Sequence, residues 1–388
     1  MLSNRVMWAL SICFSLVLTS VLFACWYQRS TQLTVTGNQL TDLQKVEEQW
    51  AKYAEDARLE RAQGISGIPT GVFIQSMDFR DTSRVYLAGY LWMHFARTLP
   101  DAYNAWKSGC DGEELPFIFA DQVDAAGDIA PELRYQYGSS LGNLCGWYFE
   151  VTLREKFDYL QYPFDQKTVS LRLWTRNLLR NVLLYPDFAA YPEGTGASDL
   201  FGYDSERMVI DSLKIRNTFF SYSRTSFSTT FGTLDHRLLS ESPELNYNVV
   251  LTRSLVDGMV EHLLGVIVVL ILLFATMLVA SRDSAKAERH GFNTAMVLGA
   301  CSALFFVILL AHIQIRAQFS GTTIVYLETY FYLTYALLIG TTVNTYLFSE
   351  EPTRFSSLLH YRDNLLPKLL YWPLVLSYSV AVTLVMLY

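Results

Sequence analysis

The sequence predicts an extracytoplasmic β-sandwich ectodomain followed by a four-helix transmembrane domain, with an additional N-terminal hydrophobic helix. Three observations favour this fold class. Apolar and polar residues alternate in many short segments between residues 67 and 253, as in strands with one buried face. Hydrophobic runs of about 20 residues, enough to cross a bilayer core, occur near the N-terminus and again after residue 254. The chain is 51% hydrophobic and 14% aromatic, which is too apolar for an ordinary soluble enzyme.

Five hydrophobic runs are candidates for membrane spans, at residues 6–26, 263–280, 292–315, 322–348 and 369–388. Lys and Arg residues near the run ends predict the orientation, because basic residues favour the cytoplasmic side. Placing Arg5 and the two basic loops between the later runs inside puts the strand-rich region outside. We therefore expect a signal or N-terminal membrane anchor at 1–27, a helical segment at 38–66, a β-sandwich at 67–253 and a four-helix pore domain at 254–388.

The N-terminal run leaves three alternatives open: a cleaved signal, a retained anchor helix and a lipoprotein signal. Leu22-Phe23-Ala24-Cys25 fits a lipoprotein processing site only loosely, since Phe23 is bulky. Two of the five cysteines, Cys110 and Cys145, fall in the outside domain, where disulfides persist. A bond between these two cysteines and two separate buried thiols are both open interpretations.

The most distinctive segment covers residues 146–174. Apolar and polar residues alternate on both sides of a turn, which predicts a hairpin with one buried face. Its tip is Tyr162-Pro163-Phe164-Asp165, where Pro163 lacks a backbone donor and makes the turn rigid. Aromatic rings exposed at such a tip need a surface to press against, such as a membrane domain.

This tip and the strand after it resemble the signature loop of the pentameric ligand-gated ion channels, the Cys-loop receptor superfamily. The two cysteines that name the animal receptors would fall at Glu155 and Val169, so the resemblance is to bacterial members that lack them. The family also places an Arg where the last strand meets the first membrane helix. The resemblance therefore implies that five residues couple the two domains: Tyr162, Pro163, Phe164, Asp165 and Arg253. A pairing of Arg253 with Asp165 is one interpretation, and a juxtamembrane Arg facing lipid headgroups is the other.

The same resemblance implies a homopentamer with an unknown small-molecule ligand bound between neighbouring subunits. Six residues fall on or near the strands and loops that the family uses for binding: Tyr90, Trp92, Phe119, Asp121, Trp174 and Phe231. Aromatic rings in such a place can hold a cationic ligand. For any single ring, burial in the core is the simpler interpretation.

The third hydrophobic run is expected to line any pore for inorganic ions. Seven of its residues recur every three or four positions and share one helix face: Thr294, Leu298, Ser302, Phe305, Leu309, His312 and Arg316. The resemblance places this face of helix 292–316 where the family lines its pore. Phe305 is the bulkiest of the seven, so we expect it to close the resting pore by dewetting. Ordinary helix packing is the alternative interpretation of an apolar stripe.

No enzyme signature, cofactor site or metal-ligand cluster emerges from the sequence, and the net charge of -7 gives no support to a nucleic-acid partner. The expected function is that of a ligand-gated channel in a bacterial inner (cytoplasmic) membrane, with a periplasmic ectodomain. The alternative is a non-conducting sensor or scaffold that keeps the channel fold and signals to a partner. Gly265, where the family has a kink-forming Pro, favours that alternative.

Overall fold

The computed structural model describes residues 3–33, 38–56, 66–110, 112–123, 128–140, 142–176, 182–191, 201–206, 208, 210, 213–224, 243–282, 293–319, 323–351 and 358–388. The chain forms two compact units. We call them the helical unit, made of Met1–Gln32, Asp158–Asp165 and Arg253–Tyr388, and the β unit, made of Leu33–Phe157 and Gln166–Thr252.

The predicted fold class is wrong in the order and composition of its parts. The chain begins with a helix, continues through the sheets and ends in helices, and the first helix belongs to the same unit as the last ones. Hydropathy identifies an apolar run but not the helix it packs against. The N-terminal helix was therefore predicted as an addition to a separate C-terminal domain. The helical unit is instead assembled from three stretches of chain that are far apart in the sequence.

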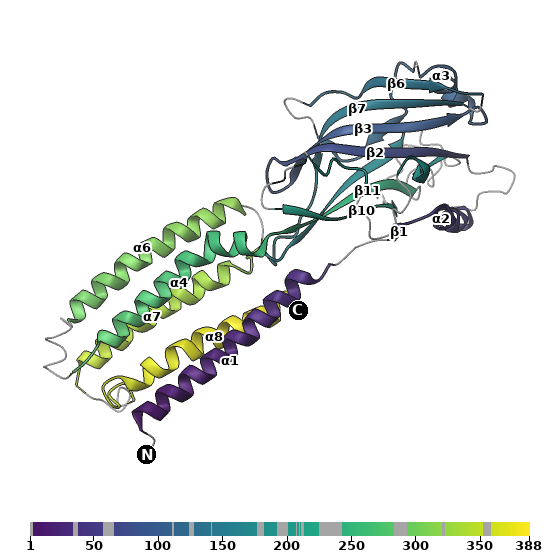
Figure 1. The fold of residues 1–388 in the computed structure, drawn as a ribbon. Helices are drawn as coiled ribbons and strands as arrows, with labels where there is room; N and C mark the ends of the chain where they lie inside the picture. Colours follow the sequence, from purple (N-terminus) through teal and green to yellow (C-terminus); the bar gives the residue numbers. More distant parts are fainter. Residues whose placement is uncertain are drawn as a thin grey trace. The chain divides into compact units, whose positions relative to one another are not determined.

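The β unit consists of two sheets (Figure 1). Sheet A has the strand order β1-β10-β11-β8-β4, and sheet B has the order β5-β7-β3-β2-β9, with β6 also paired to β7. The strands of sheet A are β1 Gln39–Leu40, β4 Phe117–Phe119, β8 Gln166–Thr175, β10 Leu213–Arg224 and β11 Pro243–Arg253. Those of sheet B are β2 Ser66–Phe79, β3 Arg84–Ala96, β5 Gln122–Val123, β6 Glu132–Gly138, β7 Gly142–Arg154 and β9 Val182–Pro186. Short helices are α2 Leu43–Asp56, η1 Asp101–Tyr103, α3 Asn104–Ser108 and η2 Phe188–Ala190.

One hydrophobic core lies between the two sheets. Leu91 and Phe149 from sheet B and Leu171 and Val249 from sheet A belong to the same cluster of buried side chains. Each buried residue of this size contributes about 1.5–3 kcal/mol to folding. The alternation in the sequence identified these inward faces correctly, because side chains on a strand alternate between its two sides.

The segment around the Tyr-Pro-Phe-Asp motif is not a hairpin. Strand β7 pairs with β3, β5 and β6 in sheet B, whereas β8 pairs with β11 and β4 in sheet A. The chain between them therefore crosses from one sheet to the other. Alternation predicts that both strands exist but does not predict which neighbours they take. We call Asp158–Asp165 the tip segment.

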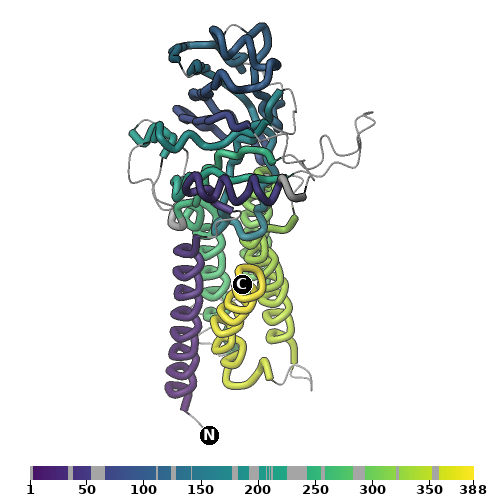
Figure 2. The backbone as a smooth tube through the Cα atoms, turned by 90° about the vertical axis from the view of Figure 1, so that its right-hand side faces the viewer, coloured from purple at the N-terminus to yellow at the C-terminus, as the bar shows by residue number. Residues whose placement is uncertain are grey.

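The helical unit contains five long helices (Figures 1 and 2), counted over the residues that the structure describes: α1 Asn4–Thr31, α4 Leu255–Val279, α6 Thr294–Gln318, α7 Glu328–Ser349 and α8 Leu365–Leu387. Helix α1 packs along α8, and α4 contacts α6, α7 and α8. Among the described residues four helices are long and apolar enough to cross a membrane: α1, α4 from Gly258, α6 and α8. This set is consistent with a multi-pass membrane protein.

Helix α7 occupies most of the predicted run 322–348 but is not among these four candidates. Its sequence includes Glu328, Asn344 and several Thr and Tyr residues, and these polar groups lower its mean hydropathy. Several of them are buried, including Glu328, Thr334 and Thr345. The two threonine hydroxyls donate to backbone carbonyls one turn earlier in the same helix, which satisfies them without water.

Candidate functional site

The tip segment lies within the helical unit, although both strands that flank it belong to the β unit. Tyr162, Phe164 and Asp165 are almost completely buried there. The Tyr162 ring packs 4.6 Å from the ring of Phe319, which follows α6, and 5.7 Å from that of His262 on α4. The aromatic rings that the sequence placed at an exposed tip are therefore covered by residues of this unit.

Backbone and side-chain hydrogen bonds fix the tip segment further. The Tyr326 amide donates to the Leu160 carbonyl at 2.8 Å, just before α7 begins. The Tyr162 hydroxyl and His262 Nε2 are 3.1 Å apart. Burial raises the pKa of the Tyr162 hydroxyl to about 12, although the nearby Arg253 opposes that shift. The hydroxyl thus stays protonated and available as a hydrogen-bond donor at neutral pH.

Arg253 meets the tip segment at the point where β11 leads into α4. Its Nε lies 4.0 Å from Asp165 Oδ1, and its guanidinium carbon lies 4.9 Å from the centroid of the Tyr162 ring. The Arg253 side chain is 15% exposed and that of Asp165 1%. The structure thus has the ion pair rather than an Arg facing outward, and a cation–π contact accompanies it.

Gly258 allows α4 to approach the tip segment closely. A Cβ added to this residue would lie only 2.7 Å from Pro163 Cβ and 3.3 Å from Arg253 Cδ. By contrast, nothing lies within 4 Å of a Cβ added at Gly265 on the same helix. The position of the tip segment therefore depends on a glycine at 258 and not at 265.

The seven predicted pore residues lie beside the buried stripe of α6, which consists of Val297, Cys301, Ile308 and Ile315. Four of the seven contact α7. The rings of Phe305 and Tyr335 are 5.8 Å apart, His312 stacks on Phe331 at 5.1 Å, and Arg316 binds Glu328. Thr294 is hydrogen-bonded to Ser349 at 2.7 Å. Leu298, Ser302 and Leu309 complete the predicted set, and the first two are exposed.

Glu328 is the acidic partner that sequence reasoning missed. It is fully buried, accepts from Arg316 Nη1 at 3.2 Å and accepts from the Val325 amide at 3.1 Å. His312 Nε2 lies 3.9 Å from the same carboxylate. The sequence did contain a signal for this pair, because Glu328 is an acid within an apolar run and comes 12 residues after Arg316. The positive charge at this end of α6 is balanced within the chain.

The predicted ligand residues are distributed over both sheets rather than gathered at one place. Tyr90 and Trp92 lie on β3 of sheet B, and the Tyr90 ring is 5.4 Å from that of Tyr148. Phe119 is buried in the core, and Asp121 accepts two hydrogen bonds from Arg172. Trp174 is paired with Ile118 across β8 and β4. Phe231 lies outside the described residues.

A cavity of about 440 Å³ opens at one end of sheet B. This volume is within the range of small-molecule sites. Its lining is mostly aromatic, small and uncharged: Gly67, Pro69, His94, Phe95, Ala96, Tyr137, Gly138, Ser139, Gly142, Asn143, Leu144 and Tyr185. Neither His94 nor its partner Asp187 was predicted, because the two are 93 residues apart and belong to no local pattern.

Asp187 holds His94 at the edge of this cavity. Its Oδ2 atom accepts from Trp92 Nε1 at 2.9 Å and lies 3.1 Å from His94 Nε2. Burial by itself would raise the pKa of Asp187, but these hydrogen bonds outweigh burial and hold the pKa below its usual value. One of the six predicted ligand residues, Trp92, thus supports a cavity-lining side chain.

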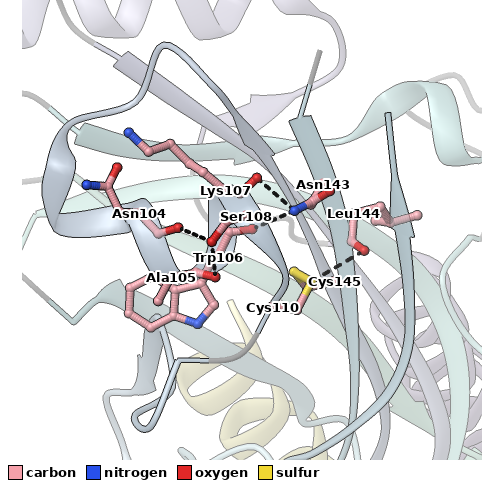
Figure 3. The surroundings of a disulfide bond; sticks show 9 residues. All are labelled: Asn104, Ala105, Trp106, Lys107, Ser108, Cys110, Asn143, Leu144 and Cys145. Carbon is pink, nitrogen blue, oxygen red and sulfur yellow. Dashed lines mark hydrogen bonds between the residues drawn. A yellow bond between two sulfur atoms is a disulfide. The ribbon is translucent and has the colours of Figure 1, made fainter. Parts of the chain in front are cut away.

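The disulfide Cys110–Cys145 lies beside the same cavity (Figure 3). It links the segment after α3 to β7, with the two Cα atoms 5.8 Å apart. Asn143, which lines the cavity, donates to the carbonyls of Trp106 and Lys107 at 3.3 and 2.7 Å. The bonded cysteines and this amide fasten α3 and the segment after it to β7, the strand that contributes Gly142, Asn143 and Leu144 to the cavity wall.

No group of three or more metal-ligating side chains occurs among the described residues. Comparison with models of protein families found no family that matches this sequence, and comparison with curated proteins found no match. The functional argument therefore depends on the geometry of the chain itself.

Proposed function

We propose that this chain is a subunit of a homopentameric ligand-gated ion channel, in which a small molecule bound by the β unit opens a pore lined by α6. The proposal assigns no catalytic activity and no cofactor. The observation that supports it best is the tip segment. It is buried among residues of the helical unit, meets Arg253 and Gly258 at the start of α4, and continues without a break into two strands of the β unit.

Such a connection suits a channel because the tip segment joins β7 to β8, so a shift of either strand acts directly on residues packed in the helical unit. The tip segment contacts Phe319 at the end of α6 through Tyr162, and a rearrangement there reaches the helix proposed to line the pore. Ring symmetry is required because one copy of α6 cannot enclose water. The resemblance of the Tyr-Pro-Phe-Asp motif to the family's signature loop points the same way.

The proposed location is a bacterial inner membrane with the β unit in the periplasm. Two observations support it: basic residues concentrate at the ends of the apolar helices that would face the cytoplasm, and the β unit contains the disulfide Cys110–Cys145. The cavity beside His94 is large enough for a small-molecule ligand, although the predicted site lies between subunits.

Ion flux from liposomes that contain the purified full chain tests the proposal without knowledge of the ligand. A small polar residue in an apolar throat lets water enter, so Phe305→Ser should leak ions constitutively, whereas Phe306→Ser should mainly disturb packing. Phe306 is the matched control because it is one position, about 100°, around the helix. A leak from Phe306→Ser alone would place the pore on the more exposed face of Phe306 and Leu310.

A non-conducting sensor with the same architecture is the second candidate. The observation that favours it is the apolar character of α6, whose most exposed large side chains include Phe306, Leu310 and Ile313. If native mass spectrometry shows intact pentamers and no serine variant leaks, the sensor is correct and the channel is not. Monomers or dimers alone in mild detergent would contradict the pentamer itself.

A further inference from the structure

Helix α1 has one partly buried stripe along almost its whole length. Its members recur at helical spacing: Trp8, Ser11, Ser15, Leu18, Leu22, Trp26 and Arg29. The other faces are exposed, with Leu16 at 61% and Tyr27 at 72%. A helix with one packed face and apolar faces elsewhere suits a lipid environment, where the exposed side chains do not need polar character. No periodic signal marked this stripe in the sequence because both faces are apolar.

Helix α1 packs along α8 (Figure 1), and three polar contacts join it to residues of and just before α8. Ser11 Oγ donates to the Leu369 carbonyl at 2.6 Å, and the Tyr388 hydroxyl donates to the Cys25 carbonyl at 2.9 Å. Near the N-terminus, Arg362 donates to Asn4 Oδ1 at 2.6 Å. In an apolar medium each of these groups would otherwise lack a partner, so the contacts favour a stable association.

The C-terminal turns of α1 contact the tip segment. Arg29 donates to Gln161 Oε1, while Gln161 Nε2 donates to the Met386 carbonyl at 3.2 Å. Gln161 is thus held from two sides, by α1 and by the end of α8.

An aromatic contact lies next to it. The Phe164 ring lies 6.3 Å from the ring of Trp26 and 5.8 Å from that of Tyr326. Trp26 Nε1 also donates to the Tyr326 hydroxyl at 2.8 Å. That hydroxyl belongs to a buried cluster with Tyr330 and Thr383. Trp26 therefore joins the tip segment to a polar cluster between α7 and α8.

We propose that α1 is a retained helix of the helical unit whose last turns hold the tip segment in position. Processing after Ala24 would remove the part of the stripe that binds α8 through Ser11, and with it Asn4, which binds Arg362 just before α8. This role does not depend on ion conduction, because the contacts are the same in a channel and in a non-conducting sensor. Trp26 and Arg29 are positioning residues for the tip segment.

Hydrogen–deuterium exchange of the full chain in detergent tests the positioning role. The tip segment has measurable amides, since Tyr162 donates to the Tyr159 carbonyl at 3.0 Å and Phe164 to the Gln161 carbonyl at 2.7 Å. Trp26→Ala and Arg29→Ala should each speed exchange in residues 158–165 by about tenfold, because local opening there costs less free energy. Tyr27→Ala is the matched control, since its exposed side chain lies between them in the sequence.

Gln161→Ala removes the same hydrogen bond from the other side and leaves α1 intact, so it should reproduce the effect of Arg29→Ala even if that variant folds poorly. Unchanged exchange in all three variants, or an equal increase in Tyr27→Ala, would overturn the positioning role.

Intact mass spectrometry of the protein purified from membranes tests retention. The expected mass includes the residues of α1 before Cys25. A chain that begins at Cys25 with attached lipid, or anywhere after α1, would overturn it.

Discussion

Two Arg–carboxylate pairs among the described residues of the helical unit differ in how far apart the two partners lie in the sequence. Asp165 is 1% exposed and lies 4.0 Å from Arg253, 88 positions later in the chain. Glu328 is 0% exposed and binds Arg316 at 3.2 Å, only 12 residues away. The first carboxylate is brought in by the tip segment from another part of the sequence. The second lies on the first residue of α7, the helix that follows α6 in the sequence.

Under the proposed function, this difference predicts different roles for the two pairs. Arg316 is 45% exposed and can approach Glu328 with good geometry, which suits a structural link between two neighbouring helices. Arg253 is mostly buried, and its guanidinium group also makes a cation–π contact with the Tyr162 ring. The Arg253–Asp165 contact is longer and is shared with Tyr162, so it costs less free energy to rearrange. A coupling contact in a channel has to rearrange when the channel opens. The comparison predicts that the Arg316–Glu328 pair contributes more to stability and the Arg253–Asp165 pair more to function.

The largest effect is expected from Arg316→Ala. It leaves Glu328 buried without its cation, which should lower the free energy of unfolding by about 3–5 kcal/mol. Thermal unfolding of the detergent-solubilised protein measures it, with the exposed Gln314→Ala on the same helix as control. The double variant with Glu328→Ala should recover part of the loss. A loss no larger than that of Gln314→Ala would mean that Glu328 is satisfied without Arg316.

A smaller stability effect is expected from Arg253→Gln, about 1–3 kcal/mol, because the 4.0 Å pair is weaker and shared with Tyr162. A double-mutant cycle with Asp165→Asn gives the coupling energy directly. Under the proposed function, the same change should abolish ligand-driven flux while the pentamer stays intact. A coupling energy above that of the Arg316–Glu328 pair would reverse the comparison.

Gly258→Ala tests whether the packing of the tip segment against α4 depends on the close approach of the α4 backbone. The added methyl would meet Pro163 at 2.7 Å, so we expect a loss of about 1–3 kcal/mol. Gly265→Ala on the same helix meets nothing within 4 Å and should be neutral or stabilise by about 0.5–1 kcal/mol. Thermal unfolding of both variants checks the contrast. Equal melting temperatures would show that the tip segment moves aside without cost.

The last prediction concerns pH and Glu155, a carboxylate of the β unit directly after the end of β7. Burial raises its pKa to about 7, even though the Ser170 amide donates to its Oε1 atom at 2.8 Å. The folded state therefore binds its proton more tightly than the unfolded state, whose pKa is near 4.5. Stability contributed by this proton is present below about pH 4.5 and is lost as the pH rises through about 7.

The melting temperature of the β unit should accordingly fall as the pH rises over that range. Glu155→Gln should remove this slope, since an amide does not titrate and keeps an oxygen that accepts from Ser170. A slope that survives the substitution would assign the pH dependence to another group.

The sequence by itself determined the elements with a strong local signature. Alternation located strands such as β8 and β11, and apolar length located α1, α4, α6 and α8, because period and hydropathy are local properties. The tip motif and Arg253 were also found from the sequence, since Pro163 and the strand-to-helix junction are recognisable from a few neighbouring residues. The sequence did not determine which other elements these helices and strands contact.

Only the tertiary structure decided the partners. It paired β7 and β8 with different sheets, placed α1 against α8 and the tip segment, and buried Glu328 beside Arg316. It likewise brought His94 to Asp187 across 93 residues. The physical reason is the same in each case. A buried polar or apolar group requires a partner, but any of several distant residues can meet that requirement, and packing alone selects among them.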